Sequence, residues 1–277
     1  MATYDIDTTA QLCGVHPITL RTWQRHGLIK PHRTPQGQRL YSDDDLSQIH
    51  VILDWVNRGV PLGQIRSRIL GETTECLNGW REIQAEILTC LDHFDADKLR
   101  RITWRCGREY PPANLVNDVF RPLRRFLASS KHPLMKQQLG LLDGTIIEYS
   151  AFILTTSRKK GLPRILLMAM HIRDPLEMWL EAMSLAGEGL RVEVISATIA
   201  EPDLSRFNMQ HYVIWSDKRL NERQQALFHG WEAEGLPVML VGHVTQLPVA
   251  AVKPQPANVD TALIEKLFYN GVYISNR

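Results

Sequence analysis

The chain has 277 residues, of which 44% are hydrophobic and 22% charged, a composition typical of globular proteins and a length that allows two or three domains. Its 32 basic and 30 acidic residues give a net charge of +2, which excludes a uniformly basic nucleic-acid coat, so any DNA binding must come from a local patch. The first residues lack a signal-peptide pattern and no apolar run approaches the ~18 residues of a membrane span, which predicts a cytoplasmic protein without a membrane partner.

An acid-free segment stands out near the start of the chain. Residues 8–42 contain no Asp or Glu, and they carry five cationic side chains with three histidines between them: Arg21, Arg25, Lys30, Arg33 and Arg39. Such a segment is either a solvated basic face or a surface for a polyanion, for which DNA is the first candidate. The order of the elements within it favours DNA.

Two short helices joined by a turn are expected first. Residues 8–14 read as a helix that Gly14 ends, and Pro17 suits the first position of a second helix that runs to about residue 26. Leu20 and Trp23, three residues apart, share the face toward the first helix. The outer surface is left with Thr19, Arg21, Thr22 and Arg25. Polar and Arg residues on an exposed helix suit a major groove, where Arg binds phosphate or guanine edges.

A basic hairpin is expected next. Residues 34–37, Thr-Pro-Gln-Gly, have the signature of a type I turn between two short strands. Alternation along the second strand puts Arg39 and Tyr41 on one face and Leu40 in the core. Arg33, Arg39 and Tyr41 would then lie on the outer side of a wing that contacts the phosphate backbone. Packing of Tyr41 against the following helix is an equally open interpretation.

Ser42 and Asp45 fit a capping box that begins a third helix, and Pro61 opens a short fourth one. Residues 6–69 resemble the winged helix-turn-helix of the MerR family of bacterial transcription regulators, through the motifs TLRxW, GLIKP, G-x-RLY and RGVPLGQIR. The resemblance implies that Arg21 and Trp23 contact DNA from the groove helix, and that Arg39 and Tyr41 contact phosphate from the wing.

This first domain is placed at residues 1–75. Two positions depart from the family pattern: His16 stands where many relatives have a Ser N-cap, and Gln24 stands where many have an acid. The full predicted DNA-binding set is Thr19, Arg21, Thr22, Trp23, Arg25, Arg33, Arg39 and Tyr41.

Residues 76–161 are expected to form an antiparallel four-helix bundle. Apolar residues recur at three- and four-residue steps from about residue 78 to residue 156, with a break at Pro111-Pro112. The basic cluster of Arg121, Arg124 and Arg125 and that of residues 158–160 are interpreted as solvated faces in preference to DNA or partner contacts. The family usually dimerises through a helix after its DNA domain. Because Gly71 interrupts that segment here, the start of the bundle is the expected dimer contact.

Residues 162–247 are expected to form a flavodoxin-like parallel sheet with helices on both faces. Strands at 164–169, 191–196, 212–215 and 238–241 alternate with helices at 175–186 and 220–235. Residues 248–277 read as a Pro-rich linker and a short helix at 261–270. The predicted fold class is therefore multidomain, α and α/β: winged helix-turn-helix, helical bundle, then sheet.

A bundle followed by such a sheet resembles the cobalamin-binding module of methionine synthase and of light-sensing MerR regulators. That family uses a D-x-H-x-x-G loop, whose His ligates cobalt, and a W-x9-E-H motif. Here the His position falls on Asp174 and the Gly position on Glu177, with His171 three residues too early. In the bundle, Gln138 replaces the Trp and Tyr149 the His, although Glu148 fits. The fold is expected without the cofactor.

The remaining signals for chemistry are weak. The four cysteines, at positions 13, 76, 90 and 106, form no CxxC pair and no zinc-finger spacing. No nucleophile–base pair or phosphate loop appears, so neither an enzyme nor a metal or cofactor site is predicted. The Leu-Asp-Gly run at 142–144 and the Trp-Leu-Glu run at 179–181 resemble an enterobacterial branch of the family. The resemblance implies a regulator of curli and biofilm genes that is itself governed by signalling proteins and not by a cofactor.

The predicted function is a homodimeric regulator that binds and distorts promoter DNA for RNA polymerase. Residues 76–277 are expected to receive a signalling protein. The alternative is a cobalamin-dependent light or cofactor sensor.

Overall fold

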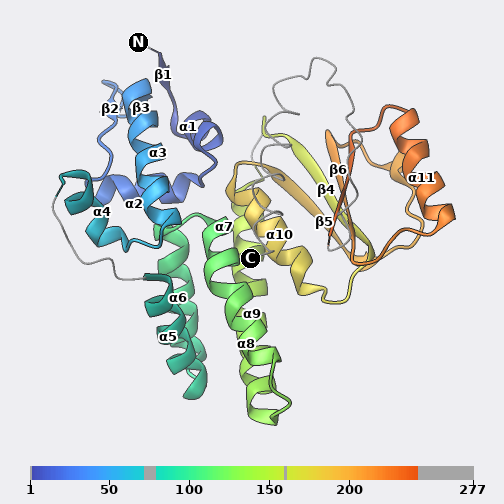
Figure 1. The fold of residues 1–277 in the computed structure, drawn as a ribbon. Helices are drawn as coiled ribbons and strands as arrows, with labels where there is room; N and C mark the ends of the chain where they lie inside the picture. The colour runs from blue at the N-terminus through green and yellow to red at the C-terminus, as the bar shows by residue number, and fades with distance from the viewer. Residues whose placement is uncertain (1, 72–78, 159–160, 243–277) are drawn as a thin grey trace.

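The structure, a computed structural model, describes residues 2–71, 79–158 and 161–242. Three parts follow one another along the chain: a winged helical head, a helical bundle and a parallel sheet flanked by helices (Figure 1). This is the predicted fold class. The linker at 248–258 and the helix at 261–270 lie outside the described residues, as does Cys76.

The head contains three short strands and four helices. They are β1 (Thr3–Tyr4), α1 (Ile6–Cys13), α2 (Pro17–Arg25), β2 (His32–Arg33), β3 (Arg39–Ser42), α3 (Asp43–Asn57) and α4 (Leu62–Ile69). The strands form an antiparallel sheet in the order β1-β3-β2. Helix α1 begins earlier than expected because the Asp5 side chain accepts a hydrogen bond from the Thr8 amide at 2.7 Å. The expected capping box of Ser42 and Asp45 is present at the start of α3.

The bundle consists of α5 (Gly79–Asp92), α6 (Ala96–Glu109), α8 (Arg121–Ala128) and α9 (Pro133–Thr156), with a short α7 (Pro112–Asn114) before α8. A π-helical turn η1 (Leu115–Phe120), which the sequence reading missed, joins α7 to α8. Pro122 explains it, because proline lacks an N–H and its ring clashes with the carbonyl four residues earlier. That carbonyl, of Asp118, instead accepts a hydrogen bond from the Gln84 side chain at 2.6 Å.

The sheet domain has four parallel strands in the order β5-β4-β6-β7. Its elements are β4 (Arg164–His171), α10 (Leu176–Gly187), β5 (Arg191–Thr198), a 3-10 turn η2 (Leu204–Arg206), β6 (His211–Ser216), α11 (Glu222–Ala233) and β7 (Val238–Val241). Alternate residues of β4 serve two cores. Leu167 packs in the large core with α10 and the bundle, whereas Leu166 and Met168 pack in a smaller core with Trp231 of α11.

One continuous core joins the head, the bundle and α10. Helix α10 lies along α9, and the head lies across the end of the bundle where α6 and α9 terminate (Figure 1). The described helices include none that is both long and apolar enough to cross a membrane. Because the head and the sheet domain both pack against the bundle, these contacts set the orientation of each relative to the bundle.

Candidate functional site

Helix α2 is held by its own sequence in the geometry of a groove helix. The N-cap His16 accepts a hydrogen bond from the Ile18 amide through Nδ1 at 3.2 Å, and Pro17 occupies the first turn, where its missing N–H costs nothing. Leu20 and Trp23 are fully buried and anchor the inner face of the helix. This anchoring leaves Arg21 and Arg25 exposed on the outer face.

The structure divides the eight predicted DNA-contacting residues into two groups. Arg21, Arg25 and Arg33 are exposed and Arg39 is half-buried, as a surface for DNA requires. The other four are buried: Thr19, Thr22, Trp23 and Tyr41. Each of these four side chains is at most 5% exposed, so the structure does not place Thr19, Thr22 and Tyr41 on the outer surface where they were expected. These four side chains belong to the core beneath the exposed arginines.

The buried members have identifiable structural roles. Thr22 donates its hydroxyl to the Ile18 carbonyl at 3.1 Å and accepts a hydrogen bond from Arg25 at 2.9 Å, which fixes that guanidinium beside α2. Tyr41 faces the core, contrary to the expectation that it shares the outer face of the wing with Arg39. Burial raises the pKa of Tyr41, and the nearby charges of Arg39 and Arg21 partly offset that effect.

A side-chain bond ties the wing to the groove helix. Arg39 of β3 donates from Nε to Oε1 of Gln24 in α2 at 2.7 Å. Gln24 is the position where an acid is usual in the resembling family, so a neutral acceptor here leaves the charge of Arg39 uncompensated. Within the described chain, Arg21, Arg25, Arg33 and Arg39 form no ion pair with an Asp or Glu, so their charge is available to a polyanion.

The head docks on the bundle through hydrogen bonds that the sequence did not reveal. Trp23 donates from Nε1 to the Glu109 carbonyl at the end of α6 at 2.8 Å. His16 Nε2 lies 3.4 Å from the Thr156 hydroxyl at the end of α9. The amide of Leu62 lies 3.4 Å from the Tyr110 hydroxyl. The groove helix thus contacts the ends of two bundle helices through its N-cap and its central anchor.

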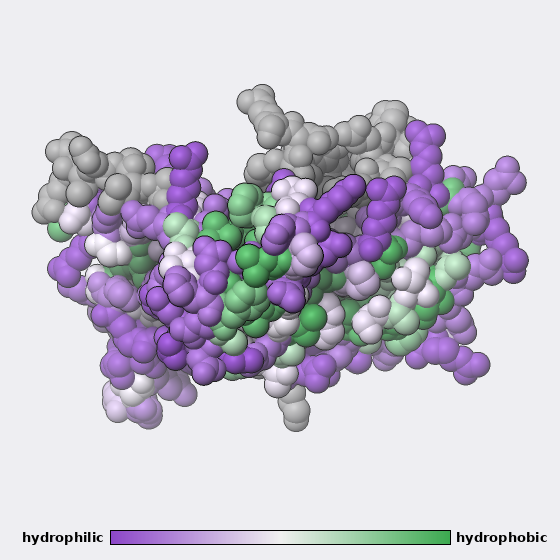
Figure 2. Space-filling model, turned by 90° about the horizontal axis from the view of Figure 1, so that it is seen from below, coloured by the Kyte–Doolittle hydropathy of each residue, from purple (hydrophilic) through white to green (hydrophobic). Residues whose placement is uncertain are grey.

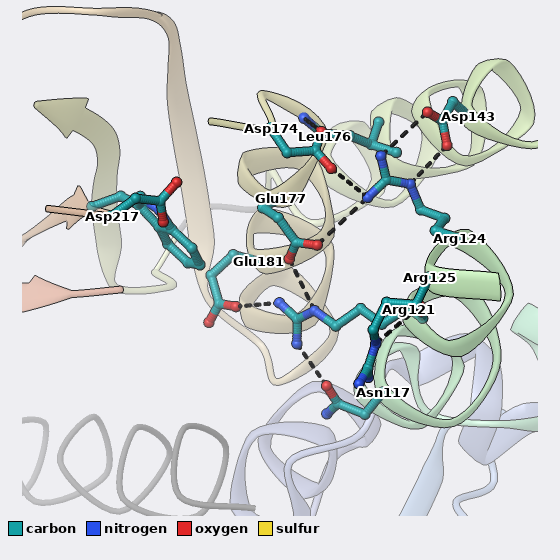
Figure 3. Close-up of polar contacts among 11 residues, drawn as sticks. Asn117, Arg121, Arg124, Arg125, Asp143, Asp174, Leu176, Glu177, Glu181 and Asp217 are labelled. Atoms are coloured by element: carbon teal, nitrogen blue, oxygen red, sulfur yellow. Dashed lines mark hydrogen bonds and ion pairs between the residues drawn. The ribbon is translucent and has the colours of Figure 1, made fainter. Parts of the chain in front are cut away.

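The second candidate site is the carboxyl edge of the sheet, where doubly wound folds bind ligands. Figure 3 shows what fills the space between α8 and α10 there. Arg124 reaches Asp143 at 2.7 Å and Asp174 at 2.8 Å, and Arg121 reaches Glu177 at 2.9 Å and Glu181 at 3.2 Å. Burial lowers the pKa of Arg124, but its bonds to Asp143 and Asp174 outweigh that and raise it. This arginine–carboxylate network joins the bundle to the sheet domain.

The network corrects the expectation of a solvated basic face on the bundle. Arg121 and Arg124 do not belong to a solvated basic face: their side chains are 21% and 10% exposed, and both are paired with acids. Arg125 is exposed, as expected. In the second basic cluster, Arg158 pairs with Glu193 at 3.3 Å, and residues 159–160 lie outside the described chain.

The residues at this edge do not fit a cobalamin. Asp174, in the position of the cobalt-ligating His, is held by Arg124, and a carboxylate already paired with arginine is a poor substitute for imidazole as a cobalt ligand. His171, at the end of β4, has its Nδ1 3.2 Å from the Ser216 hydroxyl at the end of β6. In the bundle, Gln138 is buried and bonds Asp92 at 2.9 Å, and Glu148 pairs with Arg100 on the surface. The described residues also hold no metal-binding cluster of three His, Cys, Asp or Glu side chains.

Comparisons with known proteins agree with this division of the chain. Residues 4–73 match the model of the MerR HTH family regulatory proteins. Residues 80–155 match the helical domain of the transcriptional regulator MlrA, and residues 163–238 match its C-terminal domain.

Individual relatives give the same result. The chain is 33% identical over 243 residues to the HTH-type transcriptional regulator MlrA of Salmonella typhimurium, and 32% identical to that of Escherichia coli; each alignment covers 87% of this chain and all of the relative. It is 25% identical over 139 residues to the HTH-type transcriptional repressor CarH of Myxococcus xanthus, which covers 44% of this chain and 45% of that repressor.

Proposed function

Because the chain belongs to the MerR family, in the branch of the MlrA regulators, it is a DNA-binding transcriptional regulator and not an enzyme, and we propose that it binds promoter DNA as a homodimer. The observation that supports the DNA surface is the uncompensated charge of Arg21, Arg25, Arg33 and Arg39, gathered on α2 and the wing. Arg21 and Arg25 enter the major groove, and Arg33 and Arg39 contact phosphate.

The dimer contact of this proposal lies on α8 and α9 of the bundle, and not at the start of the bundle as expected from the sequence. Apolar side chains gather in the middle of the underside of the molecule, between two hydrophilic flanks (Figure 2). Among the large hydrophobic residues of the bundle, Phe126 of α8 and Leu134 of α9 are left 54% and 44% exposed. Exposed apolar patches of this kind mark protein contacts. A two-fold dimer places two groove helices on two half-sites of one operator.

The regulator acts, in this proposal, by bending and untwisting the promoter so that RNA polymerase can use it. Deformation of this kind costs of order 1–6 kcal/mol, which additional phosphate contacts repay. The head docks on the bundle through Trp23 and His16, which gives the rest of the chain a physical connection to the groove helix. Residues 76–277 then serve as the input module that binds a signalling protein. In this proposal the protein acts in the cytoplasm and controls curli and biofilm genes.

DNA binding is tested by measuring the affinity for operator DNA as a function of salt. If ~6–10 phosphates are neutralised per dimer, the affinity falls ~10³–10⁵-fold between about 50 and 200 mM salt. The operator comes from genome-wide footprinting of bound DNA. An affinity that stays constant with salt contradicts a phosphate-contacting head.

The dimer is tested by light scattering on the eluting protein. Phe126→Asp is expected to give a monomer with weakened operator binding, because a charge is placed in the apolar contact. Val51→Asp is the matched control, since Val51 is also an exposed apolar residue but lies on α3 of the head, outside the acid-free segment. A wild-type monomer at operator-saturating concentrations would exclude the dimer.

The cobalamin sensor has no structural observation in its favour, and it is not proposed. The arginine–carboxylate network fills the edge that the cofactor would need.

A further inference from the structure

The connection from β5 to β6 departs from the doubly wound pattern. In such folds each crossover between parallel strands normally contains a helix that covers one face of the sheet. Here the twelve residues 199–210 contain only the short turn η2. The smaller core on this face is closed by Leu204, Phe207 and residues of α11, and a groove runs between η2 and α11.

The groove consists of two adjoining hollows of about 470 and 280 Å³. Asp203, Leu227 and Trp231 line both hollows, so they form one continuous depression. Trp231 is buried and Leu227 is half-buried, and together they give the groove an apolar floor. A continuous depression with an apolar floor along a helix suits an elongated occupant such as a helix or peptide.

Small residues of α11 on one side of the groove leave room for the backbone of a partner to approach closely. Ala226 and Gly230 lie one turn apart on α11, and both are exposed. A Cβ built at Gly230 would have no neighbour within 4 Å, so this position faces open space and has no side chain to block an approaching group. Helix α11 has 12 residues and is therefore ~18 Å long, enough for about three turns of a second helix beside it.

The rim of the groove is acidic. Among the lining residues the charged ones are Glu201, Asp203, Glu234 and Arg223, which is three carboxylates against one guanidinium. Arg223 pairs with Glu201 at 3.0 Å, and Arg206, beside the groove, pairs with Asp203 at 3.7 Å. Glu234 is then the lining carboxylate without an ion pair among the described residues, and the rim keeps a net negative charge. Complementarity therefore favours a cationic occupant.

We propose that the groove between η2 and α11 binds a basic amphipathic helix of a partner protein, with its apolar face on Trp231 and Leu227 and its Lys or Arg residues against the carboxylates of the rim. This inference rests on the proposed input role of the C-terminal module and assigns that role a surface. Helix α11 lies at the end of the molecule opposite the head, so a bound partner leaves the DNA surface free (Figure 1).

The first test measures binding of labelled synthetic helices to the full chain by fluorescence anisotropy. One peptide of 18 residues has Leu and Phe along one face and Lys on its flanks, and a second has Glu in place of Lys. We expect the Lys peptide to bind at least roughly tenfold more tightly than the Glu peptide. Equal affinities, or no binding of the Lys peptide, would overturn the proposal.

Two glycine variants locate the binding site. Gly230→Gln fills the open wall without strain and is expected to weaken the Lys peptide roughly tenfold or more. Gly140→Gln is the matched control, because Gly140 is an exposed glycine of α9 that also faces open space. Equal effects of the two substitutions would place the peptide elsewhere and refute the groove.

The occupant is identified by a photo-crosslinking residue at position 230 of the full chain in its native cells, with the same residue at position 140 as control. The crosslinked segment is expected to be a cationic amphipathic helix of another protein. A crosslink to a second copy of this chain, or to its own residues 243–277, would contradict the proposal. Operator binding of each variant is measured in parallel. Loss of peptide binding with intact operator binding would assign the defect to the groove. Loss of operator binding would instead concern the proposed DNA-binding function.

Discussion

Arg39 is the side chain through which the wing and the groove helix act as one surface. Its guanidinium is bonded to Gln24 and carries uncompensated charge beside Tyr41. Arg39→Ala is expected to weaken binding to all DNA sequences alike and to reduce the slope of log affinity against log salt by about 1 per site, as loss of a phosphate contact does. A change confined to one operator position would mean that Arg39 reads a base.

The control for Arg39 separates contact from positioning. Gln24→Ala removes the bond that holds Arg39 and keeps its charge. For Gln24→Ala we expect a smaller loss of affinity than for Arg39→Ala and an unchanged salt slope. If Gln24→Ala changed the slope as much as Arg39→Ala does, the slope would depend on how the Arg39 side chain is positioned. Arg219→Ala, on the sheet domain, is expected to leave DNA binding unchanged.

Glu188, at the end of α10, makes the stability of the protein depend on pH. Burial, followed by the nearby charge of Glu181, raises the pKa of Glu188 to about 8, and its Oε2 has no hydrogen-bond partner among the described residues. Between pH 4.5 and 8 the folded chain keeps a proton that the unfolded chain has released. The free energy of unfolding therefore falls as the pH rises through this window.

Glu188→Gln tests this dependence, because it replaces the carboxyl group by a neutral side chain of the same size. Urea unfolding at pH 5, 6, 7 and 8 should show a decline for the wild type that the variant lacks, and the variant should be the more stable protein at pH 8. Parallel pH profiles for the two proteins would show that Glu188 titrates normally.

At the scale of single residues, the sequence assigned eight residues to the DNA-binding region, and the structure leaves four of them at the surface. Spacing placed Trp23 on the inner face of its helix, as observed, while the family resemblance assigned it a DNA contact; strand alternation placed Tyr41 outward, whereas it is buried. The burial of Trp23 depends partly on Glu109, 86 residues away, and no local pattern contains that information. Gln24 was noted as a departure, and only the structure showed that it holds Arg39.

Among the elements, α6 and α9 cross at a glycine. A methyl group at Gly107 would overlap the ring and hydroxyl of Tyr149, which is 1% exposed. Gly107→Ala is therefore expected to destabilise the chain by about 1–3 kcal/mol through overpacking, although Ala is the better helix former. Chemical denaturation measures this loss.

Gly140→Ala is the matched substitution in an exposed helix. It meets nothing within 4 Å and is expected to be neutral or to stabilise by roughly 0.5–1 kcal/mol. If Gly107→Ala behaved in the same way, the packing of α6 against α9 would be looser than the structure shows.

Helices and strands were predicted well because each has a strong periodic signal of its own. The π-helical turn η1 and the 3-10 turn η2 were missed, since both are responses to context. The first adapts to Pro122 with help from Gln84 of another helix, and the second replaces a helix that the fold would normally contain. The arginine–carboxylate network was missed for the same reason, because its members come from three separate helices and a loop.

For the whole molecule, the docking of the head depends on Trp23. Trp23→Phe keeps the ring in the core and removes the bond from Nε1 to the Glu109 carbonyl, which is expected to cost about 1 kcal/mol of unfolding free energy. Trp80→Phe is the control, because Trp80 is also buried while its Nε1 has no partner among the described residues. A larger cost for Trp80→Phe would show that the Trp23 bond contributes little to docking.

The order of parts along the chain, and the class of each, could be predicted from the sequence; their contacts could not. Composition and periodicity describe segments, whereas the interface between head and bundle is made by pairs such as His16 and Thr156, which no spacing rule connects.

The long sequence separation of these pairs also bears on how the protein is made. The head is complete after about 70 residues have been synthesised, but the partners of Trp23 and His16 follow 86 and 140 residues later. At ~5–20 residues per second, the nascent head waits on the order of ten seconds with its docking face uncovered. A polypeptide released before residue 156 lacks the Thr156 partner of His16, so we expect at least part of that face to stay uncovered in truncated products.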